Sequence, residues 1–80
     1  MAYVTSAEEL VNEFQRRRID ARLGRGSTCR ADINNVEVDV DFSDVDVSWQ
    51  GNDGGTHRAS REIDADDLAD EVIDSLVNPA

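Results

Sequence analysis

The 80-residue sequence is long enough for one domain and too short for two. Hydrophobic residues make up 39% of the chain, enough for one modest core, and their alternation with charged residues argues against disorder. The formal net charge is −10, from 18 acidic residues and 8 basic residues that are all arginine. Such acidity disfavours direct binding to nucleic acid or membrane phosphates and favours a basic partner. No apolar run approaches the roughly 18 residues of a membrane span.

The acidic charge is concentrated in the second half of the chain. Residues 1–35 hold six arginines and five acidic residues, whereas residues 36–80 hold two arginines and thirteen acidic residues. This asymmetry predicts one acidic surface rather than a uniformly acidic molecule.

The sequence also bears on where the protein works. The start, Met1–Val4, has no basic stretch followed by an apolar one, so we expect no secretory signal. The single cysteine, Cys29, cannot form an internal disulfide and fits a reduced, cytoplasmic setting. Without a disulfide to stabilise so small a core, a homodimer is compatible with the sequence.

The first predicted element is a helix that begins after Ser6. Ser6 and Glu9 have the spacing of a capping box, and apolar residues then recur on one helical face as far as Phe14. The apolar spacing fails at Arg18, so we expect the helix to end there, within about two to four residues. Residues 19–23 then alternate as a short edge strand would; a helix that continues to Gly24 is the alternative.

The middle of the chain predicts a β-hairpin that turns at Asn34–Asn35, because asparagine tolerates the left-handed conformation of tight turns. A two-residue turn at this place makes both strand faces consistent. It pairs Ile33 with Val36, Ala31 with Val38 and Cys29 with Val40 on the apolar face, and Arg30 with Asp39 and Asp32 with Glu37 on the polar face.

After Phe42 the apolar positions switch from even to odd numbers. A tight turn at Ser43–Asp44 explains the switch and would place Phe42 opposite Val45 and Asp41 opposite Asp46. A bulge within one long strand is the alternative that we favour less. A loop at residues 51–55 and a last strand between Thr56 and Ile63 follow.

The second predicted helix begins at Asp64. Its buried stripe comprises Leu68, Ala69, Val72, Ile73 and Leu76, and its acidic face comprises Asp67, Asp70, Glu71 and Asp74. The expected fold is α+β, in a single domain over residues 1–80. It has an N-terminal helix, an antiparallel meander of three to four strands and a C-terminal helix, with both helices on one sheet face.

The candidate partner-binding residues are carboxylates. The strands should place Glu37, Asp39, Asp41 and Asp46 on the uncovered sheet face, with Asp44 at the turn. Alternate strand residues are about 6.6–6.8 Å apart, so these rows approach the charge density of a nucleic-acid backbone. We add the single-signed helix face formed by Asp67, Asp70, Glu71 and Asp74. The simpler interpretation, acidic faces that serve solubility and keep strand edges from aggregating, stays open.

No pattern in the sequence predicts catalysis, a metal or a cofactor. A calcium loop that starts at Asp39 would need glycine and glutamate where Asp44 and Gln50 stand. Cys29 and His57 are too few to bind zinc and have no motif for nucleophilic catalysis. We therefore expect no enzyme activity. The arginines between positions 16 and 25 either pair with internal acids or contact an acidic part of the partner.

In size, net charge and carboxylate rows at Glu37, Asp39, Asp41, Asp44 and Asp46, the chain resembles the small acidic anti-CRISPR proteins encoded by phages. That group shares no motif, so the resemblance lies in overall character. It implies a DNA mimic that binds the basic DNA-binding surface of a type I Cas effector complex and blocks target DNA. An immunity protein or antitoxin that neutralises a basic nuclease is one alternative. A halophile-adapted domain is another, although its acidity should extend through both halves of the chain.

Overall fold

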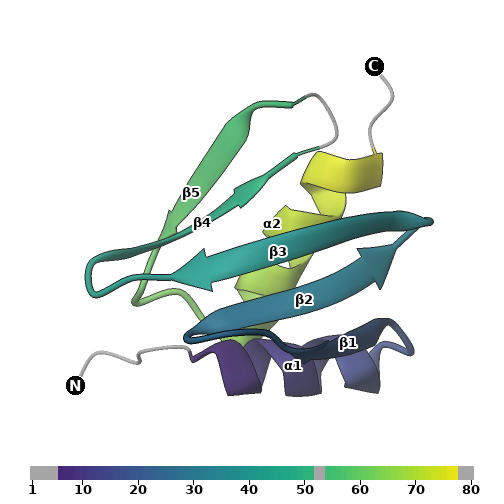
Figure 1. The fold of residues 1–80 in the computed structure, drawn as a ribbon, viewed down its shortest axis with the longest axis horizontal. Coiled ribbons are helices and arrows are strands. Elements are labelled where there is room, and N and C mark those ends of the chain that lie inside the picture. Colours follow the sequence, from purple (N-terminus) through teal and green to yellow (C-terminus); the bar gives the residue numbers. More distant parts are fainter. Residues whose placement is uncertain (1–5, 52–53, 78–80) are drawn as a thin grey trace.

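The computed structural model describes residues 6–51 and 54–77 as two helices and a five-stranded antiparallel sheet (Figure 1). The strands follow one another as a meander, in the order β1-β2-β3-β4-β5. Met1–Val4, where we expect no signal sequence, lies outside the described residues. The elements are α1 (Ala7–Arg16), β1 (Asp20–Leu23), β2 (Thr28–Ile33), β3 (Val36–Phe42), β4 (Asp46–Gln50), β5 (Thr56–Ser60) and α2 (Ala65–Val77).

Helix α1 has the predicted start and stop. Ser6 Oγ accepts a hydrogen bond from the Glu9 backbone N–H at 3.2 Å, and Glu9 Oε1 accepts one from the Ser6 N–H at 3.2 Å, which completes the capping box. At the other end Arg18 adopts a left-handed φ of 64°, which breaks the helix and turns the chain into β1. Residues 20–23 are therefore a strand and not a continuation of the helix, which decides between the two interpretations that the sequence left open.

The β2–β3 hairpin has the predicted register on both faces. Ile33 lies opposite Val36, and Arg30 lies opposite Asp39. Asn34 and Asn35 both have left-handed φ angles, 53° and 66°, as a two-residue turn of the primed type requires.

The predicted pairing of β3 with β4 is wrong by two residues. The observed pairs are Phe42–Val47 and Asp41–Ser48, in place of Phe42–Val45 and Asp41–Asp46. A turn is present, but its centre lies one residue later than predicted: the Ser43 N–H donates to the Asp46 carbonyl at 2.9 Å. Ser43 Oγ accepts from the N–H groups of Val45 and Asp46, which stabilises the longer loop.

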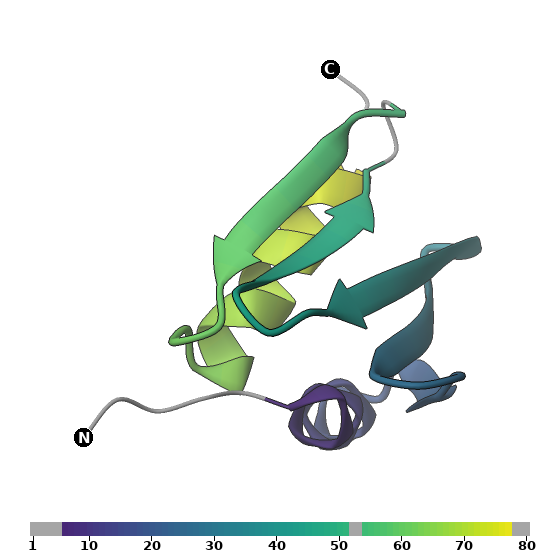
Figure 2. The same cartoon turned by 60° about the vertical axis from the view of Figure 1, so that its left-hand side comes forward.

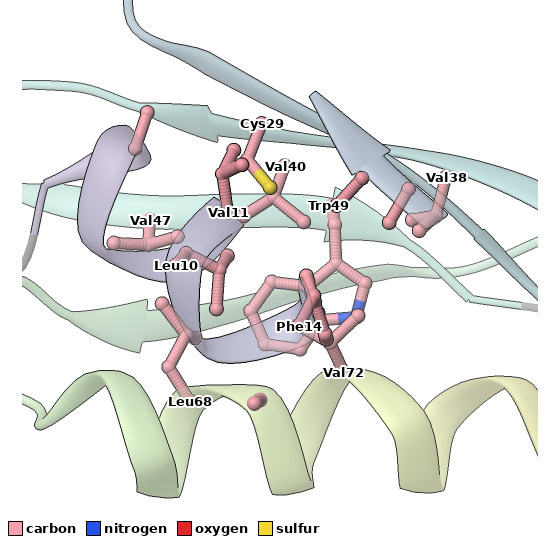
Figure 3. Packing of buried hydrophobic residues seen from close by; sticks show 14 of the residues in the cluster. Leu10, Val11, Phe14, Cys29, Val38, Val40, Val47, Trp49, Leu68 and Val72 are labelled. Atoms are coloured by element: carbon pink, nitrogen blue, oxygen red, sulfur yellow. The ribbon is translucent and has the colours of Figure 1, made fainter. Parts of the chain in front are cut away.

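Both helices cover the same sheet face, as predicted, and the core lies between them and the sheet (Figures 2 and 3). Leu10 and Phe14 of α1 and Leu68 of α2 are fully buried. The predicted α2 stripe lies in this core, with Ile73 at its edge. No helix in the described part of the chain is both long enough and apolar enough to cross a membrane.

Trp49 attaches the C-terminal half of the sheet to α2. Its side chain is 4% exposed, and its Nε1–H donates to Ser75 Oγ at 2.9 Å. Its indole ring stacks on the His57 ring of β5, with the ring centroids 5.9 Å apart. Trp49 therefore joins β4 to α2, whereas α1 packs against β1, β2 and β3.

The corrected register makes a prediction about two valines. Val45 is 79% exposed at the turn, whereas Val47 is fully buried opposite Phe42. Val47→Ala should lower the free energy of unfolding by about 1.5–3 kcal/mol, because it removes buried methyl groups and leaves a cavity. The matched Val45→Ala should change it by less than about 0.5 kcal/mol. Equal losses in urea titrations would contradict the register.

Candidate partner-binding surface

The structure places the predicted sheet carboxylates where the alternation put them. Glu37, Asp39 and Asp41 are exposed on the sheet face that no helix covers, and Asp44 is exposed in the β3–β4 turn. Asp46 is half-buried at the start of β4. We call this side of the sheet the open face.

Two of these carboxylates are held by neighbouring hydroxyl groups. Thr28 Oγ1 donates to Asp41 Oδ1 at 2.9 Å, and Ser43 Oγ donates to Asp46 Oδ1 at 2.8 Å. Each bond restricts the orientation of the carboxylate. The strands thus present these acids in defined positions rather than on mobile loops.

The open face is not single-signed, because the sheet register places arginines on it. Arg30 lies opposite Asp39 and forms an ion pair with it at 2.9 Å, which raises the pKa of the Arg30 guanidinium. Arg22 of the neighbouring strand β1 also lies opposite Arg30, and Arg58 of β5 lies opposite Ser48 of β4. The sequence predicted the Arg30–Asp39 pair, but the positions of Arg22 and Arg58 depend on the registers of β1 and β5.

The register of β1 extends the predicted Asp32–Glu37 pair into an acidic row of three residues. Asp20 of β1 lies opposite Asp32 of β2, which lies opposite Glu37 of β3. Neighbouring strands are about 4.8 Å apart, so three carboxylates lie side by side at one end of the open face. Extending the apolar pairing to Ala21 and Ala31 would have placed Asp20 in this row.

The acidic face of α2 lies on a different side of the molecule. Helix α2 lies against the covered side of the sheet (Figure 2). Its buried stripe faces the sheet, so the exposed residues Asp67, Glu71 and Asp74 lie on the helix face away from the sheet. One flat partner surface cannot contact these residues and the open face together. The structure therefore separates the predicted carboxylates into two surfaces.

Asp70, the remaining predicted α2 residue, belongs to an ion-pair cluster that joins the two helices. Arg17, just after α1, donates to Asp70 Oδ1 at 2.7 Å, to Asp66 Oδ1 and to Glu13 Oε2 at 3.0 Å. The bond to Asp70, followed by the other two, raises the pKa of Arg17 above its ordinary value despite desolvation. Glu13 is the only buried charged residue of the described chain, and Arg16 also pairs with it at 3.1 Å.

The remaining arginines of this region differ from Arg16 and Arg17. Arg22 and Arg25 are exposed, and within residues 6–51 and 54–77 neither forms an ion pair. The sequence left open whether these arginines pair with internal acids or contact the partner. Arg16 and Arg17 at the end of α1 pair with internal acids, whereas Arg22 and Arg25 of the β1–β2 hairpin do not pair with any acid in the described part of the chain.

Cys29 and His57 lie on strands β2 and β5, which are separated by β3 and β4. The Cys29 side chain lies within the core, where burial and, to a smaller extent, Asp39 raise the pKa of the thiol to about 12 (Figure 3). A thiol that resists ionisation is a poor nucleophile. Among the described residues no cluster of three or more histidine, cysteine or acidic side chains is arranged to bind a metal ion.

Replacing Arg17 tests the ion-pair cluster. Arg17→Met keeps the aliphatic stem but leaves buried Glu13 with Arg16 alone, so the free energy of unfolding should fall by about 1–2 kcal/mol. The matched variant is Arg22→Met, at an exposed arginine without an ion pair, which should change it by less than about 0.5 kcal/mol. Urea denaturation of both variants measures these changes. Equal effects would show that the ion-pair cluster does not contribute to the stability of the fold.

Burial of Cys29 predicts slow chemical modification. At pH 8 the native protein should react with iodoacetamide at least about a hundredfold more slowly than the urea-unfolded chain, because labelling requires opening of the core. Since the folded thiol keeps its proton while the unfolded thiol ionises, stability should also fall as pH rises from 9.0 toward about 12. The Cys29→Ala variant should lack this part of the fall. Rapid labelling of native protein would show that the thiol is accessible.

Comparisons with known proteins identify no relative of this chain. No protein-family model matches it, and no curated protein or solved structure matches it. What the protein does must therefore be inferred from its own charges, strand edges and core.

Proposed function

We propose that this protein inhibits a CRISPR effector complex of type I by occupying the basic surface that binds target DNA. The observation that supports this most directly is the set of ordered carboxylates on the open face of a chain whose net charge is −10. An acidic surface of this kind attracts basic grooves and repels phosphates, so it selects a protein that binds nucleic acid rather than nucleic acid itself.

The proposed mechanism is occlusion by carboxylates that take the place of phosphates. Glu37, Asp39 and Asp41 follow one another along β3 with spacings of about 6.8 Å, and Asp20 and Asp32 extend the row across the sheet. Partner arginines and lysines that normally bind phosphate would form charge-assisted hydrogen bonds with these groups. The bulk of the domain then excludes DNA from the same groove.

The two acidic surfaces have different roles in this proposal. The open face makes the contact, because its strands hold the carboxylates in place. The α2 residues Asp67, Glu71 and Asp74, which point the other way, increase the attractive field and hence the rate of encounter. The protein acts in the bacterial cytoplasm, without a cofactor and without catalysing a reaction.

The proposal predicts which charges matter. A Glu37→Gln, Asp41→Asn double variant should raise the dissociation constant for a purified type I effector complex by about tenfold or more. The matched α2 variant, Glu71→Gln, Asp74→Asn, removes the same charge and should change it by less than about threefold, because exposed charges are screened beyond about 8 Å at physiological ionic strength. Affinity should fall as salt rises. Competition with labelled target DNA measures all of these.

Capture experiments distinguish this partner from the alternatives. Nuclease-treated bacterial lysate at low salt should yield an effector complex that elutes with salt. Recovery of one basic nuclease would instead indicate an immunity protein or antitoxin. A bait that captures nothing and unfolds at low salt would leave adaptation to high salt as the explanation of its acidity.

A further inference from the structure

Strands β3 and β4 are neighbours in the sheet but separate along most of their length. They pair at Phe42–Val47 and Asp41–Ser48 and then diverge (Figures 1 and 2). Between the diverging segments is a cleft of about 400 Å³. Its lining residues are Glu37, Val38, Asp39, Asp41, Ser48, Trp49, Gln50 and Thr56.

The edge of β3 presents main-chain hydrogen-bonding groups to this cleft. The Phe42 N–H donates to the Ser27 carbonyl at 2.8 Å, so even-numbered residues of β3 direct their backbone groups toward β2. Odd-numbered residues direct theirs toward β4. Because the β3–β4 ladder ends at Asp41, the N–H and C=O groups of Glu37 and Asp39 face the cleft without a partner in that ladder. Such groups require hydrogen bonds, from water or from another chain.

The side chains around the cleft determine what it can accept. Carboxylates form the β3 wall, and the neutral polar residues Ser48, Gln50 and Thr56 form the opposite wall. Val38 and Trp49, which are 3% and 4% exposed, form the apolar floor. None of the described lining residues is basic, although Asp39 forms an ion pair with Arg30 of β2. The cleft therefore combines an available strand edge with a net negative charge.

We propose that this cleft takes up an extended, arginine-bearing segment of the basic partner as an added strand along β3. The inference rests on the proposed function and identifies the part of the partner that this site recognises. Main-chain hydrogen bonds to Glu37 and Asp39 supply affinity, as in other cases of strand addition, and side chains supply specificity.

The geometry of an added strand specifies the sequence of the segment. Ser48 already lies opposite Asp41, so the added strand pairs with the part of β3 that precedes Asp41. Its residues directly across from Glu37 and Asp39 place their side chains on the open face, beside the carboxylates, and opposite charges there are favourable. The intervening residues point to the floor made by Val38 and Trp49. A segment in which arginine alternates with a small apolar residue therefore fits. Arginine suits the site better than lysine, because its planar guanidinium can bond a carboxylate through two N–H groups.

The test uses the peptide acetyl-Arg-Val-Arg-Val-Arg-amide and the full 80-residue chain labelled with ¹⁵N. Titration should shift the amide signals of Glu37, Asp39 and Gln50 and the indole signal of Trp49. It should also slow hydrogen exchange at the Glu37 and Asp39 amides. A composition-matched peptide with its three arginines contiguous should bind about tenfold more weakly. Uniform small shifts across the α2 acids, or unchanged exchange at β3, would overturn the inference.

A filled cleft provides the second arm of the test. Gln50→Arg places a tethered guanidinium on the β4 wall, opposite the carboxylates, and should reduce peptide affinity about tenfold. The matched control is Asn12→Arg, which makes the same charge change at an exposed position of α1 outside the cleft. Both positions are exposed, so the spectra should retain the dispersion of a folded protein. Equal loss of affinity in the two variants would show that only net charge matters, which would overturn the inference.

The cleft and the proposed function can fail separately. Peptide binding at β3 without any effect on a type I effector complex would keep the cleft and remove the proposed partner. In the opposite case, the Gln50→Arg variant inhibits the effector complex as well as the original protein does, and the Glu37 and Asp39 amides show no protection from exchange. The proposed function would then stand, but the cleft would have no part in it.

Discussion

The alternation of apolar and acidic residues along β3 is the constraint on which the rest of the structure depends. Val38, Val40 and Phe42 point into the core, and the acids between them point to solvent. A slip of one residue would exchange the two sets and bury the charges, so the register of this strand is strongly specified. The same alternation confines both helices to one sheet face and leaves the other uncovered. Acidity and a compact core are thus compatible because they occupy opposite sides of one strand.

The separation of β3 from β4 follows from packing on two helices. Strands β1, β2 and β3 lie against α1, whereas the Trp49–Ser75 bond holds β4 on α2. Arg17 joins the two helices through their acidic residues, so neither half of the sheet can move far from the other. A sheet that follows two helices of different direction must twist strongly, and here it does so by ending the β3–β4 ladder early. The cleft is therefore a consequence of the core and not of a mobile loop.

The fold could be predicted from the sequence wherever the signal was local. Periodicity and turn chemistry predicted both helices and the register of the Asn34–Asn35 hairpin. In that register the residue pairs on the apolar face are all apolar, and Arg30 lies opposite Asp39 on the polar face. Periodicity could not fix the β3–β4 register, since a shift of two residues leaves every side chain on the same face. The side-chain bonds of Ser43 decide that shift. The sequence indicated which carboxylates are exposed but not which of them lie together. The Arg17 cluster joins positions that are far apart in sequence. The division of the carboxylates into two surfaces depends on which face α2 turns to the sheet.

The distribution of like charges argues that the open face serves something other than folding. The rows Asp20–Asp32–Glu37 and Arg22–Arg30 set like charges directly opposite one another, which destabilises a sheet. None of these residues contributes to the core, and the Arg17 cluster that joins the helices lies away from them. Substituting neutral polar residues would relieve the repulsion without affecting burial. The like-charged rows therefore lower the stability of the sheet that carries them, and the packing of the fold does not explain their presence.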